Sequence, residues 1–79
     1  MVATLLFLGR LEDAAGAGEL AVAPGPLETV LATLDPTLAI ALLDERVRFA
    51  LNGTLIGERG GIVLADGDEL AFLPPVSGG

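Results

Sequence analysis

The stretch PGPLETVLATLDP, from Pro24 to Pro36, decides the fold because it contains the clearest helical repeat in the chain. Its apolar residues recur with the spacing i, i+3, i+4 and i+7, which predicts a helix with one apolar face: Leu27, Val30, Leu31 and Leu34. Pro26 suits the first helical turn. Asp35-Pro36 ends the helix because the residue before a proline is disfavoured in the α region.

On both sides of this helix the period changes to two, which is typical of strands. Residues 2–8 and 19–23 are expected to form a hairpin around the small-residue loop 14–18. Residues 46–51 and 54–56 flank Asn52-Gly53, a strong hairpin dipeptide. Two further apolar segments, 62–64 and 69–73, are separated by a turn at Asp66-Gly67, and residues 37–43 form a second short helix or a turn.

Strand pairs on either side of one principal crossover helix predict an α+β domain. We expect a mixed sheet with the helix on one face, in the β-grasp (ubiquitin-like) arrangement. At 79 residues the chain is long enough for one domain only, spanning 1–79, with a flexible C-terminal Gly-Gly tail at 74–79.

The composition argues against an enzyme that acts alone. The chain has no Cys and no His, and its four cationic residues are all arginines, so the common zinc and haem ligands, a Walker lysine and a Schiff base are excluded. Asp66, Asp68 and Glu69 lack the spacing of a calcium loop, and Asp-Gly-Asp is typical of a turn. We therefore expect no metal site and no cofactor bound by the chain itself.

The net charge of −7 opposes binding to nucleic acids and to anionic membranes. The longest apolar run, from Leu38 to Leu43, has six residues, far fewer than a membrane span needs. The first residues carry no basic segment of the kind that precedes an export signal. The expected location is the cytoplasm.

Because one helix covers only one face of a sheet, strand alternation leaves a second apolar face open. The face toward the helix takes Leu5, Phe7, Phe49, Leu51, Leu70 and Phe72. The open face takes Leu6, Leu8, Leu55, Ala71 and Leu73. Single exposed leucines are ordinary, but leucines on neighbouring strands favour a contact surface for a partner protein.

The end of the sequence, Leu73-Pro74-Pro75-Val76-Ser77-Gly78-Gly79, predicts a reactive tail. Two prolines end the strand and hold the chain extended. Glycines have no Cβ, so Gly78 and Gly79 can pass a narrow channel, and the Gly79 carboxylate is open to attack. A carboxylate must first be activated, for example as an acyl-adenylate, and another protein would have to do this with ATP.

The segment Asp66–Gly79, together with Leu6-Phe7-Leu8-Gly9 and Leu51-Asn52-Gly53, resembles the small, sulfur-carrier subunit of molybdopterin synthase. The resemblance implies that an adenylyltransferase of the ubiquitin-activating kind adenylates Gly79 and that a sulfur donor protein converts it to a thiocarboxylate. The tail, with Pro74, Pro75, Val76, Ser77 and Gly78, would enter the large synthase subunit and give sulfur to cyclic pyranopterin monophosphate.

The same resemblance assigns Leu8, Leu55 and Leu73 to the apolar interface with the large subunit. Glu12 stands where members of the family often carry an arginine. Alternatives are a sulfur carrier of the thiamin pathway, a ubiquitin-like protein modifier, and an interaction module with an inert tail. The absence of lysine removes any acceptor for a tail-to-lysine link within this chain.

Overall fold

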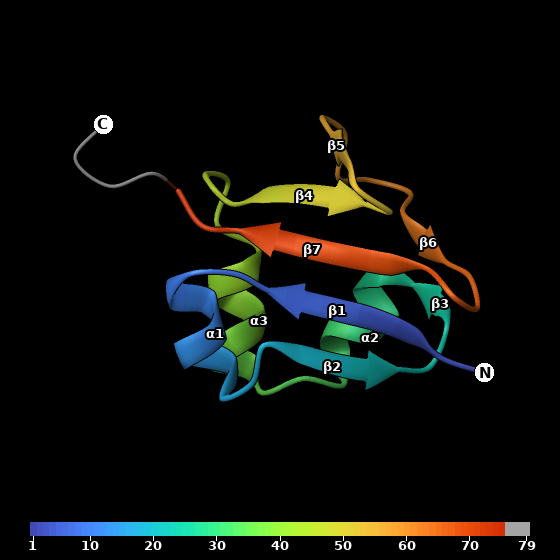
Figure 1. Ribbon diagram of the computed structural model, residues 1–79, viewed down its shortest axis with the longest axis horizontal. Coiled ribbons are helices and arrows are strands. Elements are labelled where there is room, and N and C mark those ends of the chain that lie inside the picture. The colour runs from blue at the N-terminus through green and yellow to red at the C-terminus, as the bar shows by residue number, and fades with distance from the viewer. Residues whose placement is uncertain (76–79) are drawn as a thin grey trace.

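A computed structural model of the chain describes residues 1–75. Its sheet strands and helices follow the order expected from the sequence, with two further short elements at residues 10–15 and 25–26 (Figure 1). The elements are β1 (Ala3–Phe7), α1 (Arg10–Ala15), β2 (Glu19–Val22), β3 (Gly25–Pro26), α2 (Leu27–Ala32), α3 (Pro36–Leu42), β4 (Arg48–Leu51), β5 (Thr54–Ile56), β6 (Val63–Leu64) and β7 (Glu69–Leu73).

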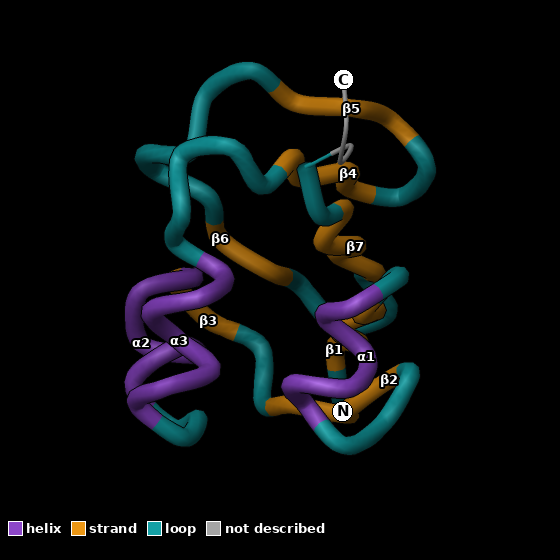
Figure 2. The backbone as a smooth tube through the Cα atoms, turned by 90° about the vertical axis from the view of Figure 1, so that its left-hand side faces the viewer, coloured by secondary structure: helices purple, strands orange, loops and turns teal. Residues whose placement is uncertain are grey.

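Five strands form one mixed sheet in the order β2-β1-β7-β4-β5. Strand β1 is antiparallel to β2 and parallel to β7, and β4 is antiparallel to both β7 and β5. The short strands β3 and β6 pair separately. Helices α2 and α3 lie together on one face of the large sheet (Figure 2). The prediction of an α+β, β-grasp domain with a mixed sheet is confirmed.

The core lies between that sheet face and the helices, and Phe72 is at its centre. The Phe72 ring stacks on Phe7, with 5.7 Å between centroids, and meets Phe49 edge to face at 5.1 Å. All three rings are buried, as are Leu5 and Leu70. The face predicted to point toward the helix is therefore confirmed, with Leu51 partly buried at its margin.

The predicted helix is confirmed as α2, but it ends at Ala32, before Leu34. The Thr33 hydroxyl donates to the Val30 carbonyl, which closes the last turn. Asp35 then caps α3, because its carboxylate accepts from the backbone N–H groups of Thr37 at 3.1 Å and Leu38 at 3.3 Å. The same Asp-Pro pair therefore separates two helices that pack on each other.

Helix α1 is not expected from the sequence, whose small residues at 14–18 predict a loop. Its only buried side chain is Leu11, so it has no repeating apolar stripe to detect. Gly16 ends the helix in the left-handed conformation and donates its N–H to the Glu12 carbonyl. The helix contacts α3 at one end of the core.

The predicted Asn52-Gly53 hairpin is confirmed. Both residues have positive φ, 51° and 85°, as a type I′ turn requires. The Asn52 amide donates to Asp68 at 3.1 Å, and its side-chain oxygen accepts from the Glu69 N–H at 2.9 Å. None of the helices within residues 1–75 combines the length and apolarity needed to cross a bilayer.

Candidate functional site: the open sheet face and the tail root

The sheet face turned away from the helices carries a row of apolar side chains. In the strand register Leu6 is opposite Ala71, Ala71 is opposite Ala50, and Ala50 is opposite Leu55. This row crosses four strands, from β1 to β5, and contains no charged residue. Leu55 is 64% exposed. The placement of these leucines on the open face agrees with the alternation of the sequence.

Leu8 and Leu73 extend this apolar face to the end of the sheet where the chain leaves β7. Leu8 is 43% exposed, whereas Leu73 is half-buried. Arg48 is opposite Leu73 in the register of β4 and β7 and is itself exposed. We call Leu73, Pro74 and Pro75 the tail root, because the tail continues from them. The open face and the tail root are thus continuous.

Strand β7 is the middle strand of the sheet, so the tail root is held from both sides. The Leu8 N–H donates to the Phe72 carbonyl at 3.2 Å, which continues the parallel pairing one residue beyond β1. On the other side Arg48 pairs with Leu73. Figure 1 shows the chain leaving β7 between β1 and β4, at the end of the sheet beside α1.

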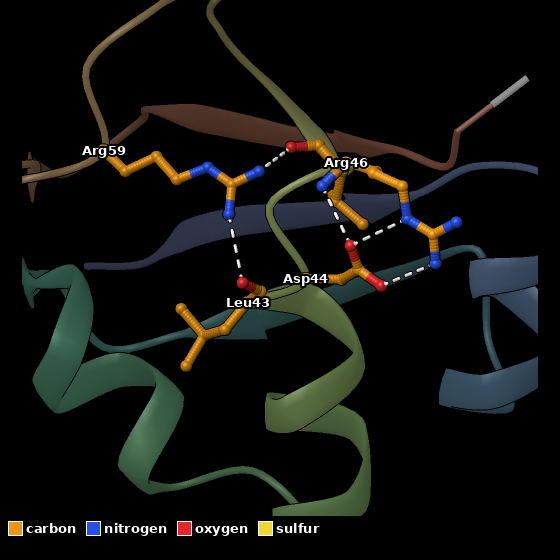
Figure 3. A network of polar contacts seen from close by, with 5 residues as sticks. Leu43, Asp44, Arg46 and Arg59 are labelled. Atoms are coloured by element: carbon orange, nitrogen blue, oxygen red, sulfur yellow. Dashed lines mark hydrogen bonds and ion pairs between the residues drawn. The ribbon is translucent and has the colours of Figure 1, made fainter.

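Two arginines lie beside the tail root. Arg46, Arg48 and Glu45 line a hollow together with Pro74 and Pro75. Arg46 forms two side-chain hydrogen bonds to Asp44, at 3.3 and 3.1 Å (Figure 3). The pKa of the Asp44 carboxyl lies below its ordinary value because the Arg46 guanidinium donates these bonds to it. Arg48 has no ion-pair partner among residues 1–75.

Arg59 has a structural role that its sequence context does not indicate. Its guanidinium donates to the carbonyls of Leu43, at 3.1 Å, and of Val47 (Figure 3). It also lies over the Phe49 ring, 4.7 Å from the centroid. The side chain thereby connects the loop before β6 to the end of α3 and the start of β4. No local pattern around Arg59 signals these contacts, since all three partners are at least ten residues away.

The acidic residues between β6 and β7 hold a turn. Asp66 accepts from the Val2 N–H at 2.9 Å, and Asp68 accepts from the Ala65 N–H at 2.9 Å. The pKa of Asp68 is lowered by that backbone bond and by the bond from Asn52. The predicted turn at Asp66-Gly67 is confirmed. In the part of the chain that the structure describes, no group of three His, Cys, Asp or Glu residues is arranged to hold a metal ion.

Of the predicted site residues, Leu8, Leu55, Leu73, Pro74 and Pro75 lie on the open face or at the tail root. Val76, Ser77, Gly78 and Gly79 lie outside the described residues. The structure therefore shows the base from which the tail starts. Leu8 and Leu73 lie at that base, and Leu55 lies on the same sheet face two strands away, on β5.

Comparisons with known proteins agree with this architecture. The model of the ThiS family matches residues 5–79. The solution structure of the small archaeal modifier protein 1 from Methanosarcina acetivorans is 28% identical, with a TM-score of 0.80 over 99% of this chain and 96% of that chain. The crystal structure of the corresponding modifier from Haloferax volcanii is 25% identical, with a TM-score of 0.73 over the whole of both chains.

A third solved structure shares the fold. It is the complex of subunits 1 and 2 of molybdopterin-converting factor from Helicobacter pylori 26695, in which the matching chain is 24% identical, with a TM-score of 0.67 and full coverage of both chains. A search of the curated proteins gave no match.

Proposed function

The chain belongs to the ThiS family, and from this membership we propose that it is the sulfur carrier of molybdopterin synthase, with Gly79 as the carrying residue. The proposal rests above all on one observation: the open apolar face runs into the tail root without a break. A partner that covers Leu8, Leu55 and Leu73 would at the same time receive the tail. One surface would thus serve both for binding the partner and for bringing the tail to it.

The chemistry requires only the last carboxylate of the chain and an activating enzyme. An oxygen of the Gly79 carboxylate attacks the α-phosphate of ATP, and pyrophosphate leaves. A sulfur donor at the oxidation level of sulfide then attacks the acyl-adenylate carbonyl, and AMP leaves. The product is a thiocarboxylate. ATP is used by the activating enzyme, so this chain needs no nucleotide site of its own.

The thiocarboxylate sulfur would next attack a side-chain carbon of cyclic pyranopterin monophosphate in the active site of the large synthase subunit, and a carbon–oxygen bond at that carbon would break. Hydrolysis of the resulting thioester leaves the sulfur on the pterin and returns the Gly79 carboxylate, and two such transfers supply the two sulfurs of the dithiolene. The apolar row suits the docking step because its burial is favourable and carries little desolvation penalty. The tail root lies next to this row, so the tail would start beside the same partner.

A second function is favoured by a specific observation. Two of the archaeal structures, with TM-scores of 0.80 and 0.73, are described as small archaeal modifier proteins. A modifier would use the same acyl-adenylate, but its terminal carboxylate would end in an isopeptide bond to a lysine of another protein. A third possibility, a carrier of the thiamin pathway, would form the same thiocarboxylate and differ only in the acceptor of the sulfur.

The test is a reconstitution with the intact chain. The chain is incubated with the cognate activating enzyme, ATP and sulfide, and its intact mass is measured. We expect a mass increase equal to the replacement of one oxygen by sulfur. The product is then mixed with the large synthase subunit and cyclic pyranopterin monophosphate, and dithiolene formation is followed. A chain extended by one residue beyond Gly79 serves as the control and should give neither product.

Three outcomes decide between the functions. Dithiolene formation supports the molybdopterin assignment. A thiocarboxylate that yields no dithiolene but supports thiazole synthesis contradicts it in favour of the thiamin pathway. Covalent attachment to lysines of other proteins, without sulfur transfer, supports the modifier.

A further inference from the structure

Gly9 stands beside Pro74 at the point where the chain leaves the sheet. The register of β1 and β7 pairs Phe7 with Phe72, and the Leu8 N–H donates to the Phe72 carbonyl. In a parallel ladder the next bond would run from residue 74 to the Leu8 carbonyl. Pro74 has no N–H to donate, and that carbonyl instead accepts from the Leu11 N–H at 3.1 Å. Ladder bonding therefore ends where Gly9 and Pro74 meet.

The Pro74 ring occupies the space that a side chain on residue 9 would need. A Cβ on Gly9 would lie 2.9 Å from the Pro74 Cγ and 3.7 Å from its Cδ. Gly9 also has a φ of 55° and a ψ of −134°, a conformation that favours glycine. Because the Pro74 Cγ belongs to a ring closed on the backbone nitrogen, it cannot move far without moving the backbone.

We propose that Gly9 is a positioning residue for the tail: because it has no side chain, the Pro74 ring packs against its backbone, and this contact sets the direction in which Pro74 and Pro75 leave the sheet. The inference rests on the proposed function, in which that tail carries the reacting carboxylate. Gly9 touches neither substrate nor ATP in this scheme. It acts through Pro74.

The direction at Pro74 matters because the sheet face and the end of the tail are to be held by the same partner. Pro74 and Pro75 both have fixed φ, so neither can absorb a change of direction easily. In general, an extended segment of five residues spans about 17 Å, so a tilt of about 10° at its start displaces its far end by about 3 Å. A misplacement of about 1 Å can already lower a rate about a hundredfold.

The test is a double-mutant cycle on the full chain. Gly9→Ala, Pro74→Ala and the double variant are compared with the wild type in ATP-dependent adenylation by the cognate activating enzyme. We expect Gly9→Ala to lower kcat/KM about tenfold to a hundredfold, mainly through kcat, because the docking face is unchanged. Pro74→Ala should lower it only about threefold. The double variant should lie within about threefold of Pro74→Ala, because without the ring the new Cβ meets nothing and only the backbone cost of a side chain at the positive φ of residue 9 remains.

Gly16→Ala is the matched control. Gly16 also has a positive φ, 77°, but nothing lies within 4 Å of its Cβ position. It therefore measures the effect of a side chain at a positive-φ glycine without the contact, and the melting curves compare the backbone cost at its ψ of 9° with that at the Gly9 ψ of −134°. Its kcat/KM should stay within about twofold of the wild type, since the new Cβ would meet no neighbouring atom. Circular dichroism melting curves accompany every variant.

The inference is overturned if Gly9→Ala has the same kcat/KM as the wild type. It is also overturned if the fold-decrease of kcat/KM in the double variant equals the product of the two single fold-decreases. Should Gly9→Ala fail to fold, Pro74→Ala decides alone: an unchanged rate overturns the inference, and a fall of several-fold supports it. Failure of the proposed function looks different, because the wild type itself would then show no adenylation.

Discussion

Replacement of Leu55 by alanine should weaken docking of the open sheet face without weakening the fold. Leu55 is on the edge strand β5 and is 64% exposed, so most of its side chain is available to a partner. Complete burial of a leucine side chain is worth about 1.5–3 kcal/mol. Two thirds of that value is about 1–2 kcal/mol, which corresponds to a rise in Kd of about fivefold to thirtyfold.

The free energy of unfolding should change by less than about 1 kcal/mol, because exposed positions contribute little to folding. Ile40→Ala is the matched control. Ile40 is 72% exposed, but it lies on α3, on the opposite side of the sheet from Leu55. It should therefore change neither the fold nor the affinity.

The assay is isothermal titration calorimetry of each variant against the large subunit of molybdopterin synthase, with urea unfolding curves measured in parallel. Equal affinities for Leu55→Ala and the wild type would refute the assignment of the open face as the docking surface. An equal loss for Ile40→Ala would refute it as well, because the effect would then not depend on the face.

Three further predictions concern the fold. Phe72→Ala removes a buried ring that touches two others and should lower the free energy of unfolding by about 3–5 kcal/mol, which urea unfolding measures. Asp35→Ala should lower the free energy of unfolding by about 1 kcal/mol through loss of the α3 cap. Asp35→Asn should retain most of the stability that the cap provides, because its side-chain oxygen can accept the same bonds. The lowered pKa of Asp68 implies stability that is complete above about pH 4 and is lost as the pH falls through the folded value. Unfolding curves from pH 6 to pH 2 should therefore show a smaller decrease for Asp68→Asn.

Each of these predictions has a clear contrary result. A loss below about 1 kcal/mol for Phe72→Ala would mean that the aromatic cluster is not the centre of the core. Equal stability of the Asp35 variants would mean that the cap bonds contribute nothing. A pH profile unchanged by Asp68→Asn would assign the acid sensitivity to other carboxylates.

The sequence could predict the parts of the fold that local chemistry determines. The helix repeat from Leu27 is read from side chains only a few residues apart. The hairpin at Asn52-Gly53 depends on two adjacent residues that tolerate positive φ. Alternation along β7 correctly placed Phe72 on the buried face of the sheet and Leu73 on the open face. In each case the residues that carry the signal are also the residues that form the contact.

Contacts between distant segments could not be predicted in the same way. Helix α1 is held by a single buried residue, Leu11, and so leaves no periodic pattern. The fit of Gly9 against Pro74 joins residues that are far apart in the sequence, and it follows from the parallel register of two strands. Arg59 finds its partners only once the loop before β6 has folded back over Phe49. Such contacts can be predicted only when the order and pairing of the strands are known.

The position of β7 determines where the tail leaves this small domain. An edge strand is bonded on one side only, and its end can separate from the sheet. Strand β7 is bonded to β1 and β4 along its length, and Phe72 anchors it to the aromatic core beneath. Any movement of Leu73, the first residue of the tail root, must therefore break its strand pairing or displace the neighbouring buried ring. A partner that binds the open face would thus meet the chain at a fixed point of the sheet, where β7 ends and Pro74 begins.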